Sequence, residues 1–239
     1  MSETTPHHTD AFPDEDRVSA RLNALRAGVL GANDGIVSIA ALLVGVVAAK
    51  PSDGVILTAA VAGIAAGALS MGVGEYVSVS SQRDAEKAQL DRERQWHDHR
   101  PDWELEQLAR LHMETGMSES TAWAAAREQT AFDPLAAHAR AHLGIDPDEL
   151  VNPWHAAYAS LGSFTLGGIF PLLTAVFAPD ALKVPLTFLV VAIALAISGT
   201  VSARLGHAPR LRAIVRNVVG GSLAMAITYG IGSFVGVHV

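Results

Sequence analysis

The chain has 239 residues, 50% of them hydrophobic and only 17% charged, and its mean hydropathy of +0.28 is too high for an ordinary soluble domain. It contains no cysteine, which excludes disulfides, thiolate metal sites, iron–sulfur clusters and cysteine nucleophiles. The formal charge of −7 lies wholly within residues 82–153, which hold 15 of the 24 acidic residues and 8 of the 17 basic ones.

The first 20 residues are polar and precede any apolar run, so we expect a disordered tail (residues 1–20) rather than a cleavable signal peptide. Five apolar runs follow, each long enough to cross a hydrocarbon layer of about 30 Å as a helix. They are residues 27–49, 54–81, 155–178, 184–203 and 217–237. The sequence therefore predicts an all-α membrane protein, with two spans in residues 21–81, a helical insert in residues 82–152 and three spans in residues 153–239.

Basic residues cluster on one side of these spans. Three arginines precede the first span and four surround the turn between the fourth and fifth, whereas the turns at 50–53 and 179–183 carry one lysine each. Because basic residues favour the cytosolic side, we expect the N-terminus, the insert and the 204–212 turn in the cytosol, and the C-terminus outside. Three GxxxG pairs occur in the spans, at residues 31–35, 63–67 and 232–236. Small residues let helix backbones approach closely, and this favours a compact bundle and a homodimer.

Two carboxylates fall inside the predicted spans, Asp34 in the first and Glu75 in the second. A carboxylate in the bilayer interior is costly unless it faces a partner or water, so both are functional candidates. Met71 lies four residues before Glu75, and this spacing places the two side chains on one helical face. With a carboxylate from a neighbouring helix, they form a ligand set suited to a borderline cation such as Fe²⁺. The structural alternatives are packing for Met71, a hydrogen bond for Asp34 and an interfacial position for Glu75.

The second span is predicted to continue into the cytosol as one helix. No glycine or proline occurs between Glu75 and Arg100, and Pro101 ends the run. Steps of 3.6 residues from Met71 trace a polar stripe from the middle of the membrane into the insert: Met71, Glu75, Ser78, Gln82, Glu86, Gln89, Glu93 and Trp96. A solvated helix face explains the cytosolic half of this stripe but not its start inside the membrane.

Short helices are expected in the insert, because helix-capping residues recur along it: Gly116, Ser118, Asp133 followed by Pro134, and Gly144. In the helix predicted between Asp133 and Gly144, His138 and His142 are spaced i, i+4. This spacing presents two imidazoles to one metal ion, and two exposed histidines are the alternative.

Three runs of the sequence are distinctive: LRAGVLGANDGIVS, AGALSMGVGEYVSVSSQRDAEKAQLDRER, and ARAHLGID followed by NPWHAAYASLGSFTLGGIFPLL. Through them, residues 21–239 resemble the vacuolar iron transporter family in its bacterial form. The resemblance implies a homodimer of five-span subunits, here in a bacterial plasma membrane, with the translocation path between the subunits. It also implies export of Fe²⁺, and of related ions such as Mn²⁺, Zn²⁺ or Co²⁺, from the cytosol in exchange for protons. An acidic cytosolic domain gathers the metal.

The resemblance assigns roles to individual residues. Asp34 and Met71 match the family's pore aspartate and pore methionine. Glu75 matches a glutamate of the bacterial and fungal-type members, which plant members lack. Glu93 and Glu104 match ligand glutamates of the cytosolic domain.

The chain departs from the family pattern at four positions. Trp96 and Gln107 stand where glutamates are expected, and His138 and His142 stand in place of a methionine and a glutamate. Imidazole ligands shift the preference toward Zn²⁺, Ni²⁺ or Cu²⁺ over Mn²⁺ and make binding sensitive to pH near about 6.5. Alternatively, the domain has lost some metal sites and is mainly structural. The candidate metal ligands are Asp34, Met71, Glu75, Glu86, Glu93, Glu104, Gln107, His138 and His142.

These features predict proton-coupled export of Fe²⁺ and related divalent metals, because a carboxylate binds either a cation or a proton. A membrane-anchored metal buffer or sensor without transport is the alternative. An enzyme is not expected, because the spans contain neither HExxH nor GxSxG. The acidic insert would repel phosphates, so nucleic acid is not an expected partner. We expect divalent metal ions and membrane lipid as partners, and no prosthetic group.

Overall fold

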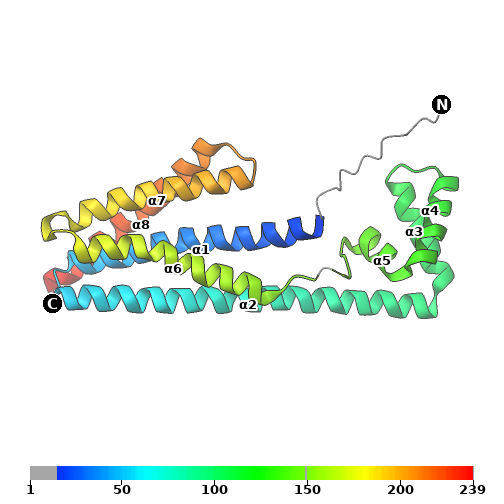
Figure 1. Cartoon of the computed structure of the whole chain (residues 1–239), viewed down its shortest axis with the longest axis horizontal. Coiled ribbons are helices and arrows are strands. Elements are labelled where there is room, and N and C mark those ends of the chain that lie inside the picture. The colour runs from blue at the N-terminus through cyan, green and yellow to red at the C-terminus, as the bar shows by residue number, and fades with distance from the viewer. Residues whose placement is uncertain (1–14, 149, 239) are drawn as a thin grey trace, which may run out of the picture. The chain divides into compact units, whose positions relative to one another are not determined.

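The structure is a computed structural model that describes residues 15–148 and 150–238, with side chains from residue 25 onward. Within these ranges it is helical (Figure 1), and five of its helices are long and apolar enough to cross a membrane. They are α1 (Glu15–Ala48), α2 (Asp53–His99), α6 (Pro153–Phe177), α7 (Lys183–Leu205) and α8 (Arg210–His238). The predicted fold class is therefore confirmed, including the short helices between the second and third spans.

The first helix begins earlier than expected. Residues 15–20 belong to α1, whereas residues 1–14 of the expected tail lie outside the described residues. No glycine or proline occurs between Glu15 and Ala27, so nothing in the sequence interrupts a helix before the first span.

The chain divides into two compact units. Residues 1–76 and 153–239 form the first, which we call the span unit, and residues 77–152 form the second, the insert unit. Helix α2 contributes residues to both. It is one continuous helix of 47 residues, about 70 Å long at 1.5 Å per residue. The predicted continuation of the second span as a single helix is confirmed, and the helix ends at His99.

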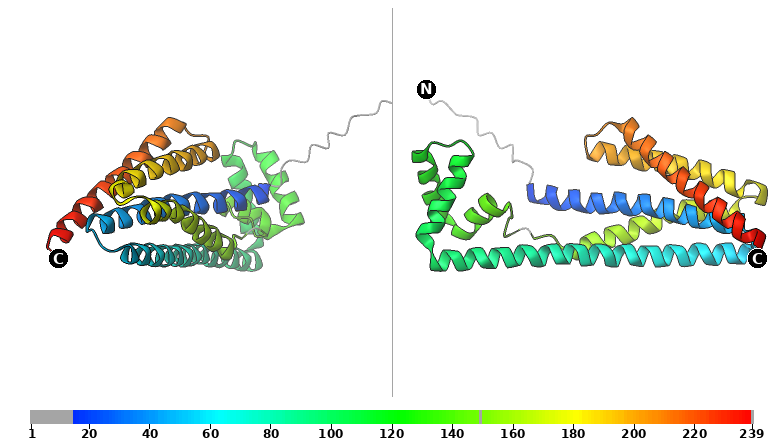
Figure 2. Two further views of the ribbon diagram at one scale, coloured as in Figure 1. Left: turned by 60° about the vertical axis from the view of Figure 1, so that its left-hand side comes forward. Right: turned by 180° about the vertical axis from the view of Figure 1, so that it is seen from behind.

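Helix α1 is the central element of the span unit (Figure 2). One buried apolar cluster joins it to α7, with Ile36 packed against Leu195. A second cluster joins it to α2 and α6 through Leu43, Ala60 and Phe164. The two clusters use neighbouring faces of α1, and further apolar residues of this helix, such as Leu30 and Leu42, are exposed, so the first span reads as a continuous apolar run.

Two GxxxG pairs bring helices together within the chain. A Cβ atom at Gly35 would clash with the backbone of Phe164 in α6, and one at Gly232 would clash with the backbone of Gly45 in α1. Glycine is therefore required at both crossings. Both motifs are used inside one subunit, and the homodimer stays a prediction.

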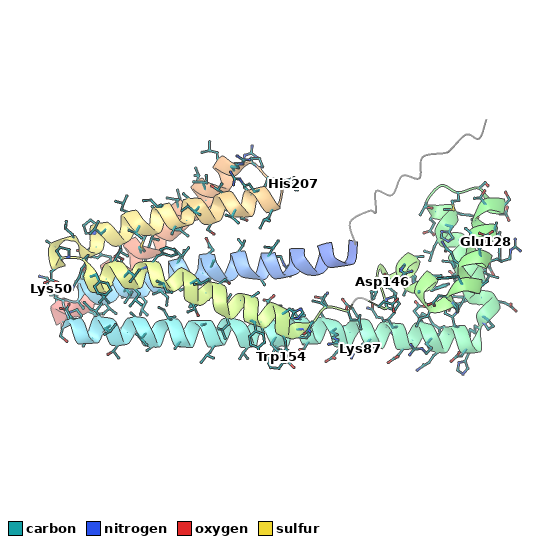
Figure 3. The ribbon with its side chains drawn as sticks, in the orientation of Figure 1. Lys50, Lys87, Glu128, Asp146, Trp154 and His207 are labelled. Carbon is teal, nitrogen blue, oxygen red and sulfur yellow. The ribbon has the colours of Figure 1, made fainter. Side chains whose placement is uncertain are left out.

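The turns of the span unit lie at two opposite ends. Figure 3 shows Lys50, before α2, at one end and His207, before α8, at the other. At the Lys50 end, Lys183 Nζ lies 2.6 Å from Asp53 Oδ1 and 2.8 Å from Asp180 Oδ1. Asp180 is the first residue of the short 3₁₀ helix η2 (Asp180–Leu182). The two lysine-bearing turns therefore share one end, and the arginine-rich turn lies at the other, as the predicted orientation requires.

Beyond its part of α2, the insert unit contains α3 (Pro101–Glu114), α4 (Glu119–Phe132), α5 (Pro134–His138) and the π-helix η1 (Ala139–Leu143). The predicted caps are confirmed. The Ser118 hydroxyl accepts a hydrogen bond from the backbone N–H of Thr121, and the Asp133 carboxylate accepts one from the N–H of Ala136 at 2.9 Å. Gly116 and Gly144 have positive φ angles of 99° and 65°.

The segment after Asp133 differs from the single α-helix that we expected. The α-helix ends at His138, and the next five residues form the π-helix. A π turn holds more residues than an α turn, and such turns are frequent at functional sites. Here the turn begins directly after His138, which is buried, and contains His142, whose side chain is 47% exposed.

Candidate metal centres

Five ionisable side chains of the insert unit meet in what we call the His–Glu cluster: Glu93 and His97 of α2, Glu104 of α3, His138 of α5 and His142 of η1. Three of them, Glu93, Glu104 and His138, are only 1% exposed. Charged side chains are almost never buried to this extent without a partner. The cluster therefore needs positive charge, as protons or as a cation.

The hydrogen bonds of His138 define which of its nitrogens carries a proton. Its Nε2 lies 2.7 Å from the backbone oxygen of Glu104, which only accepts, so Nε2–H is the donor. In the neutral imidazole, Nδ1 then carries a lone pair. This atom lies 3.2 Å from Glu104 Oε2 and 3.7 Å from Glu93 Oε2, without the alignment of a hydrogen bond. With His138 in this neutral form, lone pairs of one nitrogen and two carboxylates would face one another in a buried space.

Further atoms in the same place lack partners. Among the residues that the structure describes, the buried atoms without a hydrogen bond include His97 Nε2, Glu93 Oε2, Glu104 Oε1 and His138 Nδ1. One ligand atom from each of Glu93, His138 and His142 falls within 4.8 Å of the others, and the same holds for His97, Glu104 and His138. Each such atom is costly unless something binds it. A divalent cation would satisfy them together, because imidazole nitrogen and carboxylate oxygen are its common ligands.

His142 connects the cluster to solvent. Its Nδ1 lies 2.7 Å from Glu93 Oε1, so its N–H donates to the carboxylate. A cation bound between the two groups would replace that proton, as metal binding commonly does. Because almost half of the His142 side chain is exposed, an ion can reach the buried carboxylates from this side.

The electrostatics of Glu104 agree with a site that lacks positive charge. Burial raises the pKa of the Glu104 carboxyl, the neighbouring Glu93 raises it further, and His138 and His142 oppose the change. The net direction is upward, so the ionised carboxylate is less favourable here than in water. A cation bound at the site would favour the ionised carboxylate instead.

The structure brings together four of the predicted insert residues, Glu93, Glu104, His138 and His142. The others lie elsewhere: Glu86 accepts a hydrogen bond from Gln82 at 2.8 Å, and Gln107 is half-buried one turn after Glu104 on α3. Trp96, 40% exposed, packs edge-on against Trp103.

Sequence reasoning missed His97. Its ring packs edge-on against His138 at a centroid distance of 4.9 Å. The spacing of Glu93 and His97, i and i+4 on one helix, was the available signal. The polar stripe predicted from the sequence continues from Glu93 to Trp96 and does not include His97.

The span unit contains a second candidate site, which we call the Asp34 pocket. Asp34 of α1 and Met71 of α2 line one cavity of about 340 Å³. The remaining lining residues are Leu30, Asn33, Val37, Arg216, Asn217, Gly220 and Gly221. The structure thus brings the predicted aspartate and methionine to one space, whereas Glu75, half-buried on α2, is not among the lining residues.

The structural alternatives for Asp34 and Met71 are also met in part, and the interfacial position of Glu75 stays a prediction. The Ser38 hydroxyl donates a hydrogen bond of 2.7 Å to Asp34 Oδ1, and Met71 packs against the apolar cluster between α1, α2 and α6. Sequence reasoning used Arg216 only as a marker of orientation, but the structure places it in the lining of the Asp34 pocket. This pocket therefore combines a carboxylate, a thioether, amides and one guanidinium.

Known proteins resemble this chain over most of its length. The model of the VIT family matches residues 25–233. The chain is 46% identical over 209 residues to the "Vacuolar iron transporter" of Acanthamoeba castellanii, covering 87% of this chain and 77% of that protein. It is 36% identical over 221 residues to "Vacuolar iron transporter homolog 4" of Arabidopsis thaliana, covering 92% and 88%. It is 38% identical over 220 residues to "Vacuolar iron transporter homolog 1" of Oryza sativa subsp. japonica, covering 92% and 77%.

Proposed function

Because the chain belongs to the VIT family, a family of transporters and not of enzymes, we propose that it carries Fe²⁺ and related divalent metals across a membrane. The observation that carries this proposal is the Asp34 pocket, in which a carboxylate and a thioether from two spans line one cavity. Fe²⁺ accepts both kinds of ligand, whereas Mg²⁺ gains little from a thioether. The resemblance to the family points to the same two residues, Asp34 and Met71.

Proton exchange follows from the chemistry of the same pocket. A carboxylate binds a divalent cation only when it is ionised, so uptake of a proton by Asp34 would release the metal. We propose that protons and metal alternate at Asp34, which couples metal export to proton entry. Asn33 supports this role, because its buried Oδ1 has no hydrogen-bond partner and offers a further oxygen to a cation in the same pocket.

A homodimer would complete this pocket. Gly220 lines it and has open space where a Cβ atom would stand, so a second copy can approach closely there. One copy of Asp34 and Met71 supplies two ligands, and a divalent transition metal requires more than two. Two copies would supply four. We therefore propose that the translocation path lies between two subunits.

The His–Glu cluster gives the insert unit a separate role. We propose that it binds the cytosolic metal before transport, with Glu93, His97, Glu104, His138 and His142 as the ligand set. Imidazole and carboxylate together favour Fe²⁺, Co²⁺ and Zn²⁺ over Mn²⁺. The roles of Glu75, Glu86 and Gln107 remain predictions from the sequence.

A metal buffer or sensor is the second candidate function. It is favoured by one observation, that the cluster of the insert unit offers five ligand side chains while the Asp34 pocket of one chain offers three, Asp34, Met71 and Asn33. A buffer would bind metal in proportion to the amount of protein and would not move the metal across the membrane. Time-dependent accumulation across a membrane separates the two functions.

The proposed orientation puts the N-terminus, the insert unit and the turn before α8 in the cytosol, and the C-terminus outside. The separation of arginine and lysine turns at opposite ends of the span unit supports it. The relatives named above come from eukaryotes, so a bacterial plasma membrane stays a prediction from the sequence.

A proteoliposome assay tests the proposed function. Fe²⁺, Mn²⁺, Zn²⁺ and Co²⁺ would be supplied on the side of the insert, with metal uptake and internal pH recorded together. We expect saturable accumulation of Fe²⁺ with opposite proton movement, and loss of both with Asp34→Asn. Ser38→Ala, which removes the hydrogen bond to Asp34 but keeps its carboxylate, is the matched control and should retain transport. Wild-type flux in Asp34→Asn would contradict the assignment.

A further inference from the structure

The span unit contains a basic cavity that shares Asn33, Arg216 and Asn217 with the Asp34 pocket but is not lined by Asp34 or Met71. A cavity of about 410 Å³, which we call the arginine pocket, lies between α1, α7 and α8. Its polar lining residues are Arg26 and Asn33 of α1, Ser202 of α7, and Arg216 and Asn217 of α8. Among the described residues that line it, none is acidic. Two arginine residues thus line a pocket that lacks a carboxylate of its own.

An apolar groove adjoins this pocket. It measures about 880 Å³ and lies between α1, α6 and α7, with Ile36, Phe170, Ile193 and Ile197 among its walls. Leu25, Val29 and Leu205 line both the groove and the arginine pocket, so the two spaces are neighbours. The groove follows the spans from the arginine-rich end of the unit toward their middle, because Leu25 and Ile36 lie three turns apart on α1.

We infer that the arginine pocket and the apolar groove together bind an anionic phospholipid. Arginine binds phosphate oxygens through pairs of parallel hydrogen bonds, and basic pockets between membrane helices are suited to lipid head groups. The phosphate would lie between Arg26 and Arg216, and one acyl chain would fill the groove. A negatively charged head group fits better than a zwitterionic one, because the pocket contributes two positive charges and none of the opposite sign.

Several features favour a lipid over a free anion. A soluble anion would leave the adjoining groove unfilled, whereas a phospholipid fills the charged and the apolar space at once. The groove also lies on helices that the bilayer surrounds, so acyl chains are always at hand. Gly28 lines the groove, and a Cβ atom there would meet nothing within 4 Å, which leaves the space open to a chain.

Native mass spectrometry of the full chain in a neutral detergent tests the inference. The protein would be titrated with dioleoyl phosphatidylglycerol, dioleoyl phosphatidylcholine or inorganic phosphate. We expect one tightly bound phosphatidylglycerol per chain, an affinity about tenfold above that for phosphatidylcholine, and no binding of phosphate alone. Tight binding of inorganic phosphate would overturn the lipid assignment, as would equal affinity for the two lipids.

Two variants locate the site. Arg26→Gln should lower the affinity for phosphatidylglycerol to the level of phosphatidylcholine, and Gly28→Leu, which fills the groove, should lower the affinity for both lipids. Arg212→Gln removes an exposed arginine of α8 that does not line the pocket, and it should change neither affinity. If Gly28→Leu does not fold, Arg26→Gln decides alone, and an unchanged lipid preference in that variant contradicts the inference.

Discussion

Replacing Glu104 by glutamine tests whether the His–Glu cluster binds metal. At a free metal concentration of 100 times Kd, binding stabilises the folded insert unit by about 2.7 kcal/mol. Loss of a group that only orients a metal ligand typically weakens the affinity by about 10–100-fold, so loss of a ligand itself should weaken it at least as much. A thirtyfold increase in Kd would reduce the stabilisation to about 0.9 kcal/mol. For a unit the size of residues 77–152, the metal-induced rise in Tm should then fall from about 11–22 °C to about 4–7 °C.

In the metal-free protein, Glu104→Gln should raise the stability of the insert unit instead of lowering it. Burial and Glu93 raise the pKa of the Glu104 carboxyl, so its ionisation opposes folding. This cost is absent below the unfolded-state pKa of 4.5 and grows as the pH rises through the raised folded-state value. Glutamine has no such proton to lose. Metal-free Glu104→Gln should therefore be more stable than the wild type at about pH 7.5, and this advantage should vanish at about pH 4.

Tryptophan fluorescence of the full chain is a suitable assay, because Trp96, Trp103 and Trp123 lie in the insert unit and only Trp154 lies in the span unit. Melting would be followed with and without Zn²⁺ or Co²⁺. Glu106→Gln is the matched control, since this exposed glutamate of α3 only pairs with Arg110 and such pairs contribute little. A metal-free Glu104→Gln less stable than the wild type, with an undiminished metal response, would refute the reasoning.

Three further predictions concern other residues. His97→Ala should weaken Zn²⁺ binding by about tenfold in calorimetry, and the exposed His99→Ala should leave it unchanged. Asp34→Asn should abolish metal flux yet keep the metal-induced rise in Tm of the insert unit; loss of both would show that the substitution disrupts the fold. Gly35→Ala should destabilise the span unit by about 1–3 kcal/mol, because its Cβ meets the backbone of α6, whereas Gly74→Ala has open space. Melting in detergent compares the two, and equal Tm values would contradict the close packing.

Features encoded by neighbouring residues were predictable from the sequence. The boundaries of the insert helices follow from Ser118, Asp133 and Gly144, whose capping roles depend on atoms within a few residues. The long α2 follows from the lack of glycine and proline after Glu75. The π-helix at residues 139–143 was not predictable, because its hydrogen bonding differs from an α-helix by one residue and no local signal marks it.

The composition of each candidate site depends on contacts between distant segments, and there sequence reasoning was incomplete. His97 and Trp96 are neighbours on α2, and only the positions of α3 and α5 decide that the histidine joins the cluster. Arg216 lies on a helix that is apolar along most of its length, so its periodicity does not reveal which side faces α1. From the sequence, a basic residue next to a span indicates the orientation of the span. That Arg216 also lines the Asp34 pocket depends on how α8 packs against α1.

Arg216 links the two proposals about the span unit. It lines the Asp34 pocket and the arginine pocket, together with Asn33 and Asn217. A guanidinium beside a cation site weakens cation binding by like-charge repulsion, and this repulsion is strong where the surroundings are apolar. A lipid phosphate bound to Arg216 would offset that charge and leave Asp34 to the metal. A transport site must also release its ion, so a moderate affinity set by Arg216 suits the Asp34 pocket, whereas the His–Glu cluster, with two buried carboxylates and no arginine among its ligand groups, suits a higher affinity.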